Sequence, residues 1–176
     1  ALCATLESAS RWADFLIGTV RLALSPDPSL SGYFNGTTAC LSALLEAGRN
    51  QDILELLDLS PQKYWDYRRW GVKALAAMGK KAEAVRYAES NRDRNDSPIS
   101  IAQACEEILL SNGMSEEAYD RYAVLANQMG TYLATFRAIA QKYPGKPAAE
   151  ILRDLVDSTP GEEGKWFAAA RSAGLY

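Results

Sequence analysis

Apolar and small residues recur at helical spacing, in pairs of segments that a glycine separates. The clearest pair covers residues 75–88, where Leu75 to Met78 end one helix, Gly79 turns the chain and a second helix begins. Small and apolar residues on both sides lie where two antiparallel helices would touch. We predict a positive φ or a very close helix approach at Gly79, and the same at Gly113.

This pattern predicts an all-α chain. The expected helices are 2–24, 33–47, 51–58, 62–78, 80–91, 98–112, 115–128, 131–143, 147–157 and 163–173. Ser60-Pro61, Ser97-Pro98 and Thr159-Pro160 each offer a capping hydroxyl before a proline suited to the first helical position. We expect residues 1–30 to form a helix and linker that cap an array. Residues 31–176 would form four to five hairpins, the last of them truncated.

The helix–glycine–helix pattern returns at intervals of 29 to 34 residues. Its glycines are Gly48, Gly79, Gly113, Gly145 and Gly174, with a looser copy at Gly145. The pattern resembles the tetratricopeptide repeat, a helical hairpin of about 34 residues. The matching residues are Leu75, Gly79, Ala84 and Ala88, followed by Leu109, Gly113, Ala118 and Tyr122. The resemblance implies a TPR-like α-solenoid, a right-handed stack of antiparallel helical hairpins; the alternative is a generic bundle of antiparallel helices.

Composition narrows the chemistry that this chain can perform. Its 176 residues carry a net charge of -3 and include no histidine and three cysteines. Histidine-dependent nucleophile systems and Cys/His zinc sites are therefore excluded. Adjacent carboxylates such as Glu106 and Glu107 point about 100° apart on a helix, so they do not converge on one atom. We expect no catalytic residue, no cofactor and no metal; an enzyme that uses carboxylates alone ranks last among the functions.

The three cysteines are expected to be reduced and inert, as in a cytoplasmic protein. Cys40, Gly71 and Cys105 occupy equivalent positions eight residues before a turn glycine, where a small residue suits close helix packing. No apolar run reaches the roughly 18 residues that a membrane span needs. Because the sequence starts without methionine and stops just after a turn pattern, we expect a piece of a longer protein.

Charge is distributed unevenly along the chain. Residues 61–94 contain nine Lys and Arg against four Asp and Glu, whereas residues 95–134 contain one Arg against six acidic residues. One interpretation is a solvated face with salt bridges between neighbouring hairpins. The other is a binding groove with a basic wall and an acidic wall.

The aromatic run 64–70 is the most unusual stretch of the sequence. Helical spacing predicts that Trp65, Arg68 and Arg69 lie on one side, a composition common at the centre of protein interfaces. The alternative is a wide contact between hairpins. In repeat arrays the first helices of the hairpins line a concave face. The polar positions expected on that face are Asn35, Thr38, Ser42, Asp66, Arg69, Lys73, Gln103 and Glu107.

The resulting hypothesis is a non-catalytic scaffold that holds a protein or peptide partner in a groove. We centre the partner site on Trp65, Arg69, Lys73, Gln103 and Glu107. Nucleic-acid binding through the basic segment 61–94 is the alternative, which the acidic net charge disfavours. Self-association is a further option.

Overall fold

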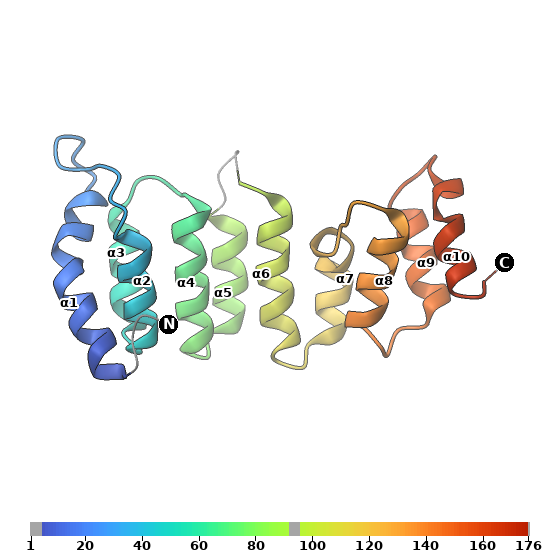
Figure 1. Ribbon diagram of the computed structural model, residues 1–176, viewed down its shortest axis with the longest axis horizontal. Coiled ribbons are helices and arrows are strands. Elements are labelled where there is room, and N and C mark those ends of the chain that lie inside the picture. The colour runs from blue at the N-terminus through green and yellow to red at the C-terminus, as the bar shows by residue number, and fades with distance from the viewer. Residues whose placement is uncertain (1–4, 92–95, 176) are drawn as a thin grey trace. The chain divides into compact units, whose positions relative to one another are not determined.

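The computed structural model describes residues 5–91 and 96–175, and it is helical, with no strand in those ranges. The helix contacts divide the chain into two compact units, Ala1–Asp96 and Ser97–Tyr176. Within each unit, helices that are neighbours in sequence lie side by side (Figure 1). The predicted all-α class is therefore confirmed.

The first unit contains five helices. They are α1 (Leu6–Ala23), α2 (Thr37–Glu46), α3 (Asn50–Leu59), α4 (Trp65–Ala77) and α5 (Lys81–Ser90). Helix α1 packs on α2 and α3, α2 also contacts α4, and α4 pairs with α5. The centre of its core consists of fully buried aliphatic side chains together with one cysteine: Val20, Cys40, Leu41, Leu44, Ile53, Leu56 and Leu57.

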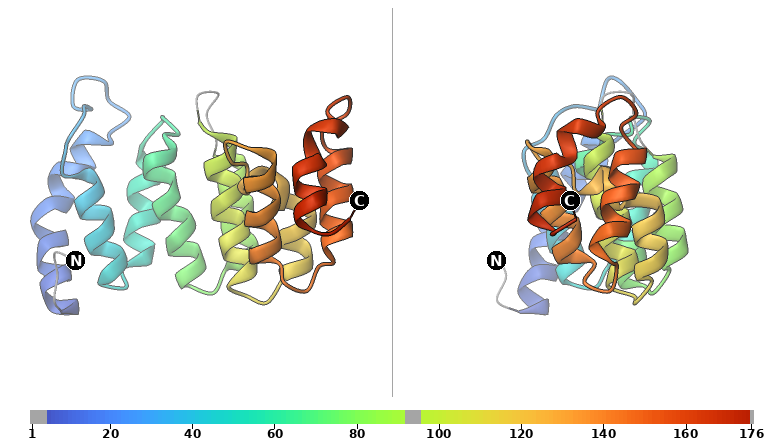
Figure 2. Two further views of the ribbon diagram at one scale, coloured as in Figure 1. Left: turned by 45° about the vertical axis from the view of Figure 1, so that its right-hand side comes forward. Right: turned by 90° about the vertical axis from the view of Figure 1, so that its right-hand side faces the viewer.

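The second unit begins with a tightly packed helix pair and continues with four shorter elements. Its elements are α6 (Pro98–Leu110), α7 (Ser115–Ala126), α8 (Tyr132–Lys142), α9 (Ala148–Asp157), the 3-10 helix η1 (Glu163–Trp166) and α10 (Phe167–Ser172). Helices α8 and α9 pack together, and α10 packs on both of them. Figure 2 shows the two partners of the α6–α7 and α8–α9 pairs running in opposite directions.

Glycine turns close the hairpins as predicted. Gly79 has φ 77° and Gly113 has φ 71°, and Gly48 adopts the same left-handed conformation with φ 71°. After Gly79, the amide of Lys80 donates to the carbonyl of Leu75 at 2.9 Å, which satisfies a carbonyl at the helix end. Gly145 does not have a positive φ, so the fourth copy turns by a different geometry.

Helix starts follow the sequence signals only in part. The Ser97 hydroxyl accepts a hydrogen bond from the amide of Ser100, and Pro98 is the first residue of α6, so this prediction is confirmed. Ser60 does not cap α4, because α4 begins only at Trp65. Ser60 instead ends α3, and its carbonyl accepts a hydrogen bond from Arg68. Thr159 does not cap the last helix either, because its hydroxyl donates back to the Leu155 carbonyl at 3.0 Å.

Close helix packing explains the small residues that the sequence singled out. Cys40 and Cys105 are buried thiols, and Gly71 is buried beside α5. A Cβ atom added at Gly71 would lie 2.7 Å from the ring of Tyr87, so only glycine fits there without a shift. Cys3 lies outside the described residues. In the described part of the chain, no helix is both long and apolar enough to cross a membrane.

Candidate functional site

Helix α4 presents one charged stripe to solvent. Asp66, Arg69 and Lys73 are exposed and follow each other at spacings of three and four residues, so they share one side of the helix. The opposite side of α4 is buried against α3 and α5 through residues such as Val72 and Leu75. The helix therefore places three charged side chains on a fixed backbone.

The ring of Trp70 lies beneath two of these cations. The Lys73 Nζ atom is 4.9 Å from the ring centroid, and the Arg69 Cζ atom is 5.9 Å from it, both within reach of a cation–π attraction. Trp70 is half-buried against the core of the first unit. Its indole N–H is buried and makes no hydrogen bond in the described structure, so apolar packing and the two cations hold the ring. We call Asp66, Arg69, Trp70 and Lys73 the α4 surface.

Neither Arg69 nor Lys73 forms an ion pair among the described residues. Arg69 donates from Nε to the backbone carbonyl of Asp66 at 3.2 Å, which orients its guanidinium without neutralising it. Several other Lys and Arg side chains of the described residues, by contrast, are paired with a carboxylate. Those pairs include Arg49–Asp14, Lys80–Glu83, Arg121–Glu117, Lys142–Glu106, Lys146–Glu150 and Lys165–Glu162.

The aromatic run does not form the exposed cluster that helical spacing predicted. Trp65 is half-buried at the first position of α4, and its backbone N–H donates to Asp96 Oδ1 at 3.3 Å. The exposed aromatic ring is instead Tyr64, which is 50% exposed and stacks edge-on against Tyr67.

Arg68 is buried, contrary to the sequence-based expectation that it flanks the site. Its guanidinium donates to the Tyr87 hydroxyl and to the carbonyl of Ser60, both at 3.0 Å. Burial raises the pKa of Tyr87, and the hydrogen bond from Arg68 opposes that rise. Arg68 thus ties α4 to α5 and fixes the loop after α3, while Gly71 leaves room for the Tyr87 ring.

The other two predicted site residues belong to the second unit, on α6. Gln103 and Glu107 are both exposed and lie one helical turn apart. The Gln103 side chain donates to the carbonyl of Ala126 at 3.0 Å, where it satisfies the end of α7. The Glu107 carbonyl accepts from the Ser111 amide at 3.0 Å, whereas its carboxylate forms no hydrogen bond or ion pair among the described residues. The five predicted residues therefore divide into a surface on α4 and a surface on α6.

Earlier in the chain, the predicted groove positions are only partly accessible. Asn35 precedes α2 and is exposed, as is Thr38, whereas Ser42 is half-buried.

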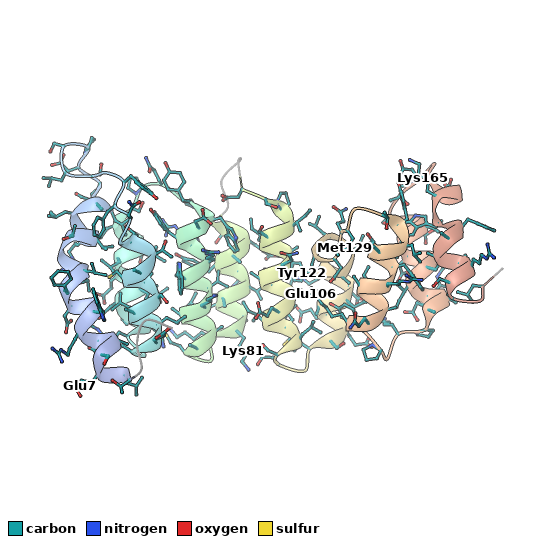
Figure 3. The ribbon with its side chains drawn as sticks, viewed as in Figure 1. Glu7, Lys81, Glu106, Tyr122, Met129 and Lys165 are labelled. Carbon is teal, nitrogen blue, oxygen red and sulfur yellow. The ribbon has the colours of Figure 1, made fainter. Side chains whose placement is uncertain are left out.

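Next to Glu107, a carboxylate is completely enclosed. Glu106 is 1% exposed and accepts hydrogen bonds from three side chains: Asn127 Nδ2 at 2.6 Å, the Tyr143 hydroxyl at 2.7 Å and Lys142 Nζ at 2.8 Å. These donors come from the end of α7 and the end of α8, so the carboxylate joins three helices; Figure 3 labels it on α6. Sequence reasoning treated Glu106 only as one of an adjacent pair and missed this role.

A second layer of polar contacts surrounds this carboxylate. Tyr143 stacks edge-on with Tyr119, with ring centroids 5.2 Å apart, and the Tyr119 hydroxyl donates to Asp154 Oδ2 at 2.7 Å. Burial, and then the hydrogen bond to Glu106, hold the pKa of Tyr143 far above its usual range. Burial and the bond to Asp154 raise the pKa of Tyr119 in the same way. Every acidic group of the cluster is thus matched by a donor, which is typical of a structural network.

No metal-binding chemistry accompanies these surfaces. Among residues 5–91 and 96–175, no three His, Cys, Asp or Glu side chains are grouped in a way that could hold a metal ion.

Comparisons with protein-family models, with curated proteins and with solved structures found no match for this chain.

Proposed function

We propose that this chain is a non-catalytic protein-interaction scaffold, and that its α4 surface binds an acidic peptide segment of a partner. The scaffold would be a TPR-like, right-handed α-solenoid within a larger cytoplasmic protein. The observation that carries the proposal is the pair Arg69 and Lys73. Both are exposed, both lie over the half-buried Trp70 ring, and neither has a carboxylate partner among the described residues.

The α4 surface is pre-organised, because the helix backbone and the Trp70 ring already restrict the two long side chains. A partner carboxylate would gain charge-assisted hydrogen bonds from Arg69 and Lys73 at a small entropic cost. The half-buried Trp70 ring offers apolar contact beside the charges, a combination enriched at binding hot spots.

The predicted residues on α6 are a separate part of the proposal, within the second unit. Glu107 is exposed and carries the opposite sign to Arg69 and Lys73. We propose that Glu107 attracts a basic residue of a partner. Trp65 and Gln103 already serve the fold through backbone hydrogen bonds, so we assign them a supporting role.

A peptide-display selection against the whole chain, followed by affinity measurements on synthetic peptides, tests the proposal. We expect acidic sequences with an aromatic or aliphatic residue to be selected. The double reversal Arg69→Glu and Lys73→Glu should weaken the binding of such a peptide at least about 10-fold, because two charge-assisted contacts become repulsive.

A matched control exists on α5. Reversing Lys81 and Arg86 changes the net charge by the same amount at two exposed positions away from α4, and Figure 3 labels Lys81 at the start of that helix. Binding should stay within about 2-fold of wild type in this variant. If both double variants lose affinity equally, the peptide is attracted by the positive charge of the whole unit, and the α4 surface is not the site.

Nucleic-acid binding through residues 61–94 is the rival outcome of the same experiment. A tryptophan under two cations can stack on an unpaired base, which favours this alternative. Burial of Arg68 and the pairing of Lys80 with Glu83 remove two of the segment's cations from the free surface. A salt titration with a single-stranded oligonucleotide decides between peptide binding and nucleic-acid binding. A steep linear fall of log affinity with log salt, sensitive to both double variants, would support nucleic-acid binding.

A further inference from the structure

Helix α1 has one packed face and one apolar face that no described element of the first unit covers. Ala9, Ala13 and Val20 are buried against the neighbouring helices. On the opposite side, Trp12 is 51% exposed, Phe15 77% and Leu22 54%. In Figure 1 the helix packs on α2 and α3 from one side only. Three large apolar side chains on one exposed face of a helix are unusual for a surface that stays in water.

The residues on the exposed face have the spacing of a coiled-coil seam. An open pocket on it is lined by Ser8, Arg11, Trp12 and Phe15. These residues occupy positions i, i+3, i+4 and i+7, the four positions that form the hole for a side chain of a facing helix. Trp12 and Phe15 meet edge to face with ring centroids 6.0 Å apart, which keeps the walls of the hole in place.

One heptad further along, the same pattern forms a second hole. Its four positions are Phe15, Gly18, Thr19 and Leu22. A Cβ atom added at Gly18 would meet nothing within 4 Å, so the glycine leaves an open notch on the solvent side of the helix. A large side chain of a facing helix can enter that notch.

We propose that α1 pairs in an antiparallel arrangement with α1 of a second copy of this chain. With Phe15 opposite Gly18 of the other copy, Phe15 enters the second hole and Leu22 enters the first. A two-fold axis generates the same contacts in reverse, so both holes of both copies are filled. The proposal goes beyond partner binding on α4, because α1 contributes nothing to that surface.

The charges beside the seam agree with this register. Asp14 and Arg21 flank the apolar face on the same side, seven residues apart. In this antiparallel register, Arg21 of the other copy lies two residues, about 3 Å along the helix axis, from the position opposite Asp14, so the two side chains can meet, twice per dimer. Asp14 already accepts from Arg49 Nη1 at 2.5 Å, and a carboxylate has lone pairs for a second donor. Arg11 would lie near the C-terminal end of the other α1, where the helix dipole favours a cation.

Sedimentation velocity of the whole chain is the first test. We expect a reversible monomer–dimer equilibrium between about 1 and about 500 µM, as for interfaces of modest area. Phe15→Glu should weaken association at least about 10-fold by placing a charge in the second hole. Phe167→Glu, at a similarly exposed phenylalanine in the second unit, should leave the equilibrium unchanged. A chain that is monomeric throughout this range, or a dimer that tolerates Phe15→Glu, overturns the proposal.

A charge-swap mixture tests the register. In a dimer of the Asp14→Lys variant, the new lysine of each copy lies near Arg21 of the other copy. In a dimer of the Arg21→Glu variant, the new glutamate lies near Asp14. Like charges then repel, so each variant alone should associate at least about 10-fold more weakly than wild type. Mixed together, the two variants form a dimer in which both pairs are attractive, and association should return. Melting curves confirm that each variant is folded. If the mixture associates no better than its components, the antiparallel register is wrong.

Discussion

Glu106 offers the sharpest test of how the second unit is held together. The change is Glu106→Gln, which keeps the size of the side chain and removes its charge. In the structure the carboxylate is 1% exposed and accepts three hydrogen bonds, with Asn127 and Tyr143 on one oxygen and Lys142 on the other. An amide can accept at its oxygen only, so its NH2 group would face a donor in place of the second acceptor.

The expected size of the effect follows from what each donor loses. The Asn127 amide keeps its bond to the Ala123 carbonyl at 2.8 Å, so it loses one bond of two. Lys142 is 39% exposed and can return to water at little cost. The Tyr143 hydroxyl is buried and depends on Glu106 alone, so weakening that bond costs about 1 to 3 kcal/mol. We expect Glu106→Gln to lower the free energy of unfolding by about 1 to 3 kcal/mol and Glu106→Leu by about 2 to 4 kcal/mol.

Urea denaturation, together with hydrogen exchange of peptides from α6 to α8, measures this loss and locates it. Glu107→Gln is the matched control: it removes the same charge one residue away at an exposed position, and it should change the free energy by less than about 0.5 kcal/mol. A double-mutant cycle with Tyr143→Phe should give a coupling of about 1 kcal/mol or more. If Glu106→Gln and Glu107→Gln are equally mild, the enclosed carboxylate does not stabilise the unit and our reading of the network is wrong.

Three further predictions concern backbone and titration. Gly79→Val should destabilise the chain by about 1 to 3 kcal/mol in urea because φ there is 77°, while Gly145→Val, without a positive φ, should cost less. Because the folded-state pKa of Tyr143 is raised, stability should be intact below about pH 10 and fall as pH rises further, and Tyr143→Phe should flatten that fall in melting curves. Burial raises the pKa of Cys40 to about 11, so Cys40 and the buried Cys105 should react with a thiol reagent only after denaturant is added.

The sequence was most informative where a signal is local. Glycines that follow an apolar helix end predicted the hairpin turns, because a left-handed residue at that point is required by backbone geometry alone. The Ser97-Pro98 start of α6 was predicted for the same reason. By contrast, Ser60-Pro61 carried an equal signal, but the prediction that it starts a helix was wrong. The side chain of Arg68, eight residues later, donates to the Ser60 carbonyl and so fixes the segment before α4 as a loop.

Roles that depend on tertiary contacts could not be read from spacing. Arg68 and Arg69 are adjacent and chemically identical, yet one is buried on Tyr87 and the other faces water. Glu106 and Glu107 differ in the same way. A helical wheel distinguishes the buried face of a helix from its exposed face only when the side that meets the core is known. In α4, aromatic residues on several sides of the helix hid which side that is. Gly71 was a usable clue, because a glycine inside a helix often marks a close neighbour.

The local pattern of helix contacts has a consequence for how the chain folds. Within each unit, the helices in contact lie no more than two helices apart in the sequence. Little loop entropy must be lost before those contacts form, so folding should be fast and can begin at any hairpin. The same locality means that strain applied to the chain ends would be released hairpin by hairpin rather than in one event. During synthesis, each hairpin can therefore pack as soon as its second helix has emerged, without waiting for the rest of the chain.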